Sequence, residues 1–171
     1  MEHAIRAACE VSGDNEIYIF GSHAILGQFP QADEKLTRSI EVDASPKNKP
    51  ETVDKIDGAL GENSPFHHTH GFYVHGVSIE AASLPEGWKD RTNKVHDYMD
   101  KNKIGSCVES HDLAASKLIA YREKDINFVR TLLVEELISA GTLEERIKLI
   151  ETEIVLKERA LNWLAKISKE L

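Results

Sequence analysis

Two acidic residues stand at alternating positions in residues 39–43 of this chain. Glu41 and Asp43 flank Val42, and Ile40 precedes them. Because neighbouring side chains of a β-strand point to opposite faces, this alternation predicts a strand with both carboxylates on one side. A carboxylate pair of this kind can hold one or two Mg²⁺ ions, which prefer oxygen ligands and share their shell with substrate phosphates. The same spacing also suits a solvated strand face.

A glycine and a serine, Gly21 and Ser22, follow the β-prone run at residues 17–20 and precede a short helical segment. Backbone N–H groups at such a strand-to-helix turn favour an anion, and glycine lets a phosphate approach the backbone closely. The pair also fits an ordinary turn. A phosphate cradle followed by a carboxylate pair on a neighbouring strand is the minimum needed for nucleotidyl transfer, with metal neutralising the triphosphate.

The sequence predicts both helices and strands as the elements that position these residues. Residues 4–11 and 51–60 have helical periodicity, whereas residues 17–20, 39–43 and 71–79 are rich in β-prone side chains. From residue 110 onward the apolar spacing is helical. We therefore predict an α/β (α+β) fold, in which a small mixed sheet with flanking helices is followed by a C-terminal bundle of about three helices. The predicted domains are residues 1–109 and 110–171.

A series of motifs along the chain resembles a known family. The run from Phe20 through Gly21, Ser22 and His23 to Pro30, followed by residues 39–43, resembles bacterial nucleotidyltransferase-like proteins of unknown function. These are similar to polymerase-β-type minimal nucleotidyltransferases and to AbiEii-type toxins. The resemblance covers most of residues 16–135 and continues through residues 64–67, 69–73, 84–88, 112–118 and 122–125.

The resemblance implies roles for particular residues. Gly21 and Ser22 would hold the phosphates of a nucleoside triphosphate, and Glu41 and Asp43 would bind Mg²⁺ and be catalytic. Lys117 would reach the nucleotide phosphates, although it also fits a solvated helix face. Lys124 is a further predicted nucleotide contact, and supporting roles are expected for His70, Asp112, Arg122 and Asp125.

The third carboxylate of polymerase-type enzymes is not evident in the sequence. The strand at residues 71–79 offers His75 and no acid before Glu80. Glu41 also stands where the superfamily usually has aspartate. If neither Glu80 nor Asp112 reaches Glu41 and Asp43, the chain would be a degenerate nucleotidyltransferase that binds a nucleotide or a protein.

Histidines between residues 67 and 75 suggest a less favoured alternative, a zinc-dependent hydrolase. On an extended segment His68 and His70 would share a face, and His67 and His75 would point the other way. Structural or surface roles suit most of them better, and one of them, such as His70, could pair with substrate or with the carboxylates. The run Ser110-His111-Asp112 is interpreted as a helix start with Ser110 as N-cap, because sequence neighbours cannot form a hydrolase triad.

Composition limits the classes of function. The chain has 171 residues, 41% of them hydrophobic, and a formal net charge of -8, which disfavours a broad nucleic-acid surface. No apolar run approaches the ~20 residues of a membrane helix, so we expect no membrane partner. Cys9 and Cys107 lie far apart without a CxxC spacing, so we expect a reducing cytoplasm. The expected activity is Mg²⁺-dependent transfer of a nucleoside monophosphate from an NTP to a hydroxyl of RNA, protein or a small molecule. A cognate antitoxin or another partner protein follows only from the resemblance.

Overall fold

The computed structural model describes residues 1–170, which form two compact units. The first unit comprises residues 1–81 and 92–108, and we call it the sheet unit. The second, the helical unit, comprises residues 82–91 together with the segment that begins at Glu109. Each unit is described by itself.

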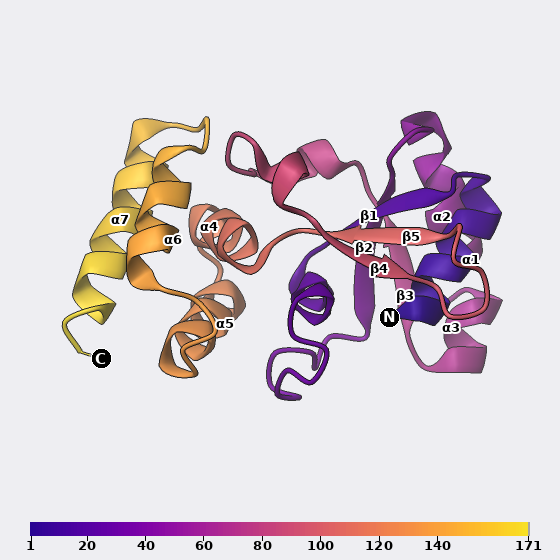
Figure 1. The fold of residues 1–171 in the computed structure, drawn as a ribbon, viewed down its shortest axis with the longest axis horizontal. Helices are drawn as coiled ribbons and strands as arrows, with labels where there is room; N and C mark the ends of the chain where they lie inside the picture. Colours follow the sequence, from indigo (N-terminus) through magenta and orange to yellow (C-terminus); the bar gives the residue numbers. More distant parts are fainter. Residues whose placement is uncertain (171) are drawn as a thin grey trace. The chain divides into compact units, whose positions relative to one another are not determined.

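A five-stranded mixed sheet forms the centre of the sheet unit, which confirms the predicted fold class (Figure 1). The strand order is β3-β2-β1-β5-β4, with β1 in the middle. β1 pairs antiparallel with β2 and parallel with β5, β2 pairs parallel with β3, and β4 pairs antiparallel with β5. The strands are β1 (Glu16–Phe20), β2 (Glu41–Pro46), β3 (Tyr73–Gly76), β4 (Asn93–His96) and β5 (Ile104–Cys107).

The two strands nearest the motifs differ in burial for a simple reason. β1 lies between two other strands, and its residues from Ile17 to Phe20 are all buried, as expected for a strand covered on both faces. In β2, Val42 and Ala44 are buried, whereas Glu41 and Asp43 are half-buried. β2 therefore overlaps the strand predicted at residues 39–43 only from Glu41 to Asp43 and continues to Pro46, with both carboxylates on its more open side.

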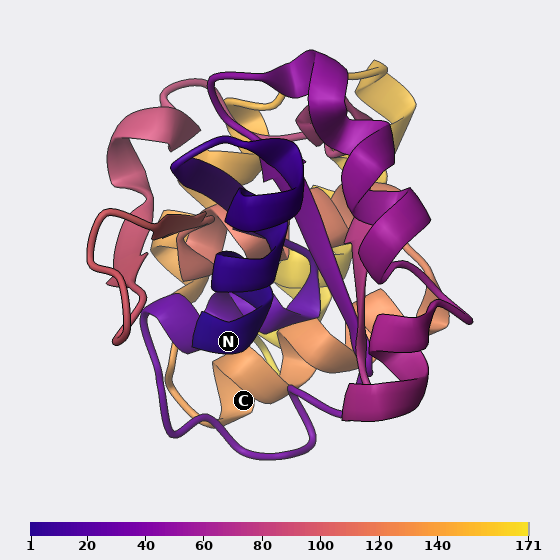
Figure 2. The ribbon, with the colours of Figure 1, turned by 90° about the vertical axis from the view of Figure 1, so that its right-hand side faces the viewer.

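Three α-helices belong to the sheet unit: α1 (Glu2–Ser12), α2 (Val53–Leu60) and α3 (Pro65–His70). Figure 2 shows α1 in front of the strands, where it packs against β1, β2, β3 and β5. Ile5 of α1 is fully buried, and a Cβ added at Gly105 of β5 would lie 2.4 Å from its Cδ1 atom. Glycine in β5 therefore lets this helix pack closely on the sheet.

The histidine-rich segment is helical rather than extended, which corrects the predicted strand geometry. Ser64 is the N-cap of α3 and accepts a hydrogen bond from the backbone N–H of His67, while Pro65 occupies the first turn. His68 and His70 are therefore helix residues. The 3-10 helices of this unit are η1 (Ser22–Gly27), η2 (Pro50–Thr52) and η3 (Ile79–Ala81).

The helical unit contains four α-helices that pack together, drawn from orange to yellow in Figure 1, where about three had been predicted. They are α4 (Ser110–Ala120), α5 (Glu123–Val134), α6 (Ala140–Lys148) and α7 (Ile154–Ile167), and η4 (Trp88–Arg91) precedes them. α5 ends at Val134, and Ser139 caps α6 by accepting from Thr142 N–H. The buried side chains include Leu118, Leu132, Leu143 and Ile147.

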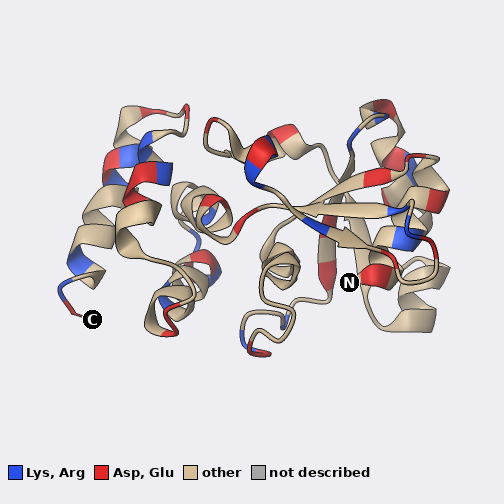
Figure 3. Ribbon diagram, in the orientation of Figure 1, with Lys and Arg blue, Asp and Glu red and all other residues tan. Residues whose placement is uncertain are grey.

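Acidic and basic residues are interspersed along α5, α6 and α7 (Figure 3). This distribution agrees with the acidic net charge of the chain and with the absence of a long basic run. None of the helices within residues 1–170 combines the length and the apolarity that a membrane crossing requires.

Candidate metal and nucleotide site

Glu41, Asp43 and His75 meet on the open side of β2 and β3. The parallel register places Asp43 beside His75 and Glu41 beside Tyr73. The Nδ1 atom of His75 lies 3.1 Å from Glu41 Oε1 and 3.1 Å from Asp43 Oδ1. One potential ligand atom from each of the three residues lies within 4.8 Å of the others. Within residues 1–170 this is the one group of three or more His, Cys, Asp or Glu side chains with such proximity.

The cluster remains open to solvent. The exposed fractions of the side chains are 31% for Glu41, 26% for Asp43 and 41% for His75. A small cation can therefore approach the three groups from the solvent. Because adjacent backbone strands carry all three residues, their spacing is set by the sheet and does not depend on a loop.

Gly21 packs directly against the Asp43 carboxylate. The antiparallel register of β1 and β2 pairs Phe20 with Asp43, so the residue after β1 meets the acidic side chain. Gly21 has φ 71° and ψ −170°, a conformation that side-chain-bearing residues rarely adopt. A Cβ at this position would lie 2.0 Å from Asp43 Oδ2. The position of the Asp43 carboxylate therefore requires glycine at residue 21. This requirement is separate from the close approach of a phosphate that the sequence predicts.

His23 is a residue whose part in the site the sequence reasoning missed. It lies in η1, and its Nδ1 atom is 3.0 Å from the backbone oxygen of Glu41, to which an Nδ1–H donates. Burial lowers the pKa of His23, which favours the neutral ring. The imidazole thus connects the turn after β1 to the first residue of β2. No sequence pattern indicates this contact, because it joins residues 18 positions apart.

Lys117 and Asp125 form a buried ion pair between α4 and α5 of the helical unit, and the exposed Arg122 also binds Asp125. Lys117 Nζ lies 3.1 Å from Asp125 Oδ1, and Arg122 Nε lies 2.6 Å from Asp125 Oδ2. Lys117 also lies over the ring of Phe128, at 4.6 Å from its centroid. Burial alone would raise the pKa of Asp125, but hydrogen bonds from Arg122 and Lys117 outweigh it and lower the pKa. Lys124 is exposed.

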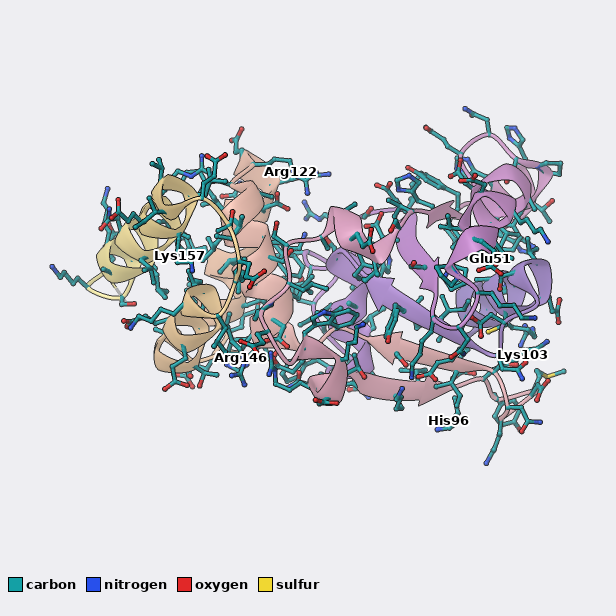
Figure 4. The ribbon with its side chains drawn as sticks, turned by 90° about the horizontal axis from the view of Figure 1, so that it is seen from above. Glu51, His96, Lys103, Arg122, Arg146 and Lys157 are labelled. Carbon is teal, nitrogen blue, oxygen red and sulfur yellow. The ribbon has the colours of Figure 1, made fainter. Side chains whose placement is uncertain are left out.

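Asp112 is held by two arginines of the helical unit. Its Oδ2 atom accepts from Arg91 Nε at 2.8 Å, and its Oδ1 atom lies 3.1 Å from both Arg91 Nη2 and Arg146 Nε. Arg146 is labelled on α6 in Figure 4, and the Asp112 side chain has no exposed surface. Both oxygens are thus already occupied within the helical unit. The N-cap of α4 is Glu109 rather than Ser110.

His70 lies among aromatic rings and outside the cluster of Glu41, Asp43 and His75. Its ring centroid is 4.4 Å from that of His3 and 4.6 Å from that of Phe66, with Phe72 next to them. His67 accepts a hydrogen bond from the backbone N–H of Asn63. The histidines of α3 therefore make no metal-binding group among the described residues.

Neither cysteine resembles a nucleophile. Cys9 and Cys107 are buried, and burial raises the pKa of each thiol to about 12. Glu80 lies in the short helix η3 and is exposed. No acidic side chain joins Glu41 and Asp43 as a third ligand within residues 1–170, and His75 stands beside them instead.

Comparison with known proteins supports the interpretation of the motifs at the level of family. No match was found among curated proteins or among solved structures. A family model described as nucleotidyltransferase of unknown function (DUF6036) matches residues 2–167, nearly the whole chain. The chain therefore belongs to this family of nucleotidyltransferases of unknown function.

Proposed function

We propose that the protein is a metal-dependent nucleotidyltransferase that moves a nucleoside monophosphate from an NTP to a hydroxyl group. The observation that carries the proposal is the meeting of Glu41, Asp43 and His75 on adjacent strands beside the Gly21 turn. Membership of a nucleotidyltransferase family supports the reaction class.

Glu41 and Asp43 are the proposed holders of Mg²⁺. Their donor set fits a divalent cation, because two carboxylates lie close together on a rigid strand and are partly exposed. A cation bound there supplies neutralisation of the phosphates and favours ionisation of the attacking hydroxyl. The positions of Glu41 and Asp43 would determine where the reacting phosphate binds. His23 and Gly21 hold the backbone and the carboxylate of this pair in place.

Gly21 and Ser22 are the proposed contacts for the nucleotide phosphates. The turn has little side-chain bulk at Gly21, so backbone amides can approach an anion. Lys117 and Lys124 are proposed as further phosphate contacts on the family resemblance. In that case Asp125 would orient Lys117, since it already binds the lysine ammonium.

The acceptor is proposed to be RNA, a protein or a small molecule with a free hydroxyl. The net charge of -8 argues that a nucleic-acid acceptor would be held at a local site rather than along a broad surface. A role beside a cognate antitoxin or in phage defence is proposed only from the similarity to AbiEii-type toxins.

The experiment that tests the reaction is label transfer. The full chain is incubated with Mg²⁺ and each α-³²P-labelled NTP, with total RNA, a protein extract or a panel of small hydroxyl compounds as acceptor. Transfer is expected for at least one acceptor, and it should disappear in the Glu41→Ala/Asp43→Ala double variant. Glu51 and Asp54 are exposed acids of the same unit, so the Glu51→Ala/Asp54→Ala variant is the matched control. Transfer that survives loss of Glu41 and Asp43 contradicts the proposed site.

A nucleotide-binding module without catalysis is the second candidate. The observation that favours it is the histidine, rather than a third acid, next to Glu41 and Asp43. This candidate predicts saturable NTP binding, measured by calorimetry, without transfer to any acceptor. Binding that depends on Gly21 and Ser22 but leaves the NTP intact would support the module over the enzyme.

A further inference from the structure

We propose that His75 is a metal ligand and that Glu41, Asp43 and His75 form a site that prefers Mn²⁺ to Mg²⁺. The inference rests on the proposed function insofar as the same carboxylates hold the catalytic cation. It differs from that function in assigning the imidazole a direct bond to the metal. It also names the class of cation, a first-row transition-metal ion, that this donor set selects.

The position of His75 is the first observation that supports its role as a ligand. A single ring atom, Nδ1, faces both carboxylates at 3.1 Å. Ligand atoms on neighbouring corners of an octahedron are separated by about 1.4 bond lengths, which is about 3 Å for bonds of about 2.1 Å. The two distances are therefore compatible with His75 Nδ1 on a corner next to each carboxylate, and the ligand atoms of the two carboxylates lie within 4.8 Å of each other. The register of β2 and β3 holds Asp43 and His75 side by side, so little rearrangement is needed.

The chemistry of the donor atoms supports the preference for Mn²⁺ over Mg²⁺. Mg²⁺ binds oxygen and keeps much of its water, so imidazole adds little to its affinity. Imidazole is a good ligand for transition-metal dications, whose affinities for sites with nitrogen donors rise from Mn²⁺ upward. The two carboxylates suit Mn²⁺, which, like Mg²⁺, accepts an octahedral shell rich in oxygen and shares it with phosphate.

The cluster contains no thiolate ligand. Cys9 and Cys107 are buried and outside this group, so the ligands are carboxylate and imidazole. Sites rich in thiolate select softer ions such as Zn²⁺ and Cu⁺. A donor set of two carboxylates and one imidazole, half open to solvent, suits an ion that must also bind a triphosphate.

Metal binding by the full chain tests the proposal without any measurement of activity. After removal of bound metal with a chelator, the affinities for Mn²⁺ and Mg²⁺ are measured by calorimetry, and bound Mn²⁺ is examined by pulsed electron paramagnetic resonance. We expect a ¹⁴N coupling from a coordinated imidazole in the wild-type protein. The coupling should change to that of ¹⁵N after labelling with ¹⁵N-histidine.

Three variants locate the nitrogen ligand. His75→Gln and His75→Asp should both lose the coupling, and His75→Asp should lower the preference for Mn²⁺ over Mg²⁺ at least about tenfold. His68→Asp is the matched control, because His68 is exposed and lies outside the cluster. It should keep both the coupling and the preference. Circular dichroism confirms that each variant is folded, and the labelled wild-type protein supplies an answer that needs no variant.

The outcomes separate this inference from the proposed function. Bound Mn²⁺ without nitrogen coupling, or an unchanged preference in His75→Asp, overturns the assignment of His75 even if label transfer with Mg²⁺ succeeds. Label transfer that fails while the nitrogen coupling is present contradicts the enzyme and leaves the metal site standing. Failure of the wild-type protein to bind Mn²⁺ overturns the inference directly.

Discussion

Replacement of Gly21 by alanine is the sharpest test of how β1 and β2 build the site. The new Cβ would lie 2.0 Å from Asp43 Oδ2, whereas an ordinary carbon–oxygen contact is about 3.4 Å. The backbone conformation, φ 71° and ψ −170°, adds a cost of about 1–3 kcal/mol for a residue with a side chain. Displacement of the Asp43 side chain from its rotamer adds about 0.5–1.5 kcal/mol. We expect Gly21→Ala to lower the free energy of unfolding by about 2–4 kcal/mol.

Gly71→Ala separates backbone strain from the clash with Asp43. Gly71 also has a positive φ, 74°, but a Cβ there meets no atom within 4 Å. Alanine at Gly71 should cost only the left-handed backbone penalty, about 1–2 kcal/mol. Urea denaturation followed by far-ultraviolet circular dichroism measures both variants, and calorimetric titration with Mn²⁺ measures the site. Gly21→Ala should weaken Mn²⁺ binding as much as Asp43→Ala does, whereas Gly71→Ala should leave it unchanged.

Either of two results contradicts the packing of Asp43 on the Gly21 turn or its control of the metal site. If Gly21→Ala is no more destabilising than Gly71→Ala, the Asp43 carboxylate is not packed on the turn. If Gly21→Ala is destabilising but binds Mn²⁺ normally, the position of that carboxylate does not control the metal site. Titration of Asp43→Ala beside the two glycine variants makes the second comparison quantitative.

Three further predictions concern groups outside the cluster. Asp112→Leu removes the buried carboxylate that accepts from Arg91, whose side chain is 24% exposed, so the free energy of unfolding should fall by about 1.5–3 kcal/mol, as measured by urea denaturation with tryptophan fluorescence. A cost below about 1 kcal/mol would contradict the pairing. Burial opposes ionisation of Glu16, but hydrogen bonds from Lys47, Lys94 and Ser106 lower its pKa to about 2, so its stabilisation is complete above about pH 4.5 and is lost as the pH falls toward 2. Thermal melts at several pH values should show that the melting temperature of Glu16→Gln falls less steeply with falling pH than that of the wild-type protein. Equal slopes in the two proteins would contradict this role of Glu16. Ser139→Ala removes the N-cap of α6 and should cost about 1 kcal/mol in the same urea assay, whereas Ser139→Asp should retain most of the stability.

The strands that carry the motifs were predictable because their signals are local. The run from Ile17 to Phe20 is apolar throughout, as a strand covered on both faces requires. The alternation around Glu41 and Asp43 assigns the two carboxylates to one side of a strand whatever the partner strands are. These two patterns and the family motifs were sufficient to predict a mixed sheet that carries an acidic pair.

β4 and β5 could not be predicted, because their composition is unlike that of most strands. β5 consists of Ile104, Gly105, Ser106 and Cys107, whose small side chains leave room for α1. β4 is an edge strand in which Lys94 and His96 are exposed. Burial in β5 comes from a helix about a hundred residues earlier in the chain, and no window of local sequence contains that information.

Periodicity in the sequence could not predict that His75 is the third member of the site. The strand pattern puts His75 on the same side of its strand as Tyr73, and that parity is visible in the sequence. The pairing of His75 with Asp43 is a register, however, and β2 and β3 are separated in the sequence by α2 and α3. A shift of β3 by one residue would place Val74 beside Asp43 and turn the imidazole to the opposite face of the sheet. Because Val74 is fully buried, such a shift would expose apolar surface, so the same burial that stabilises β3 also fixes the third donor of the site.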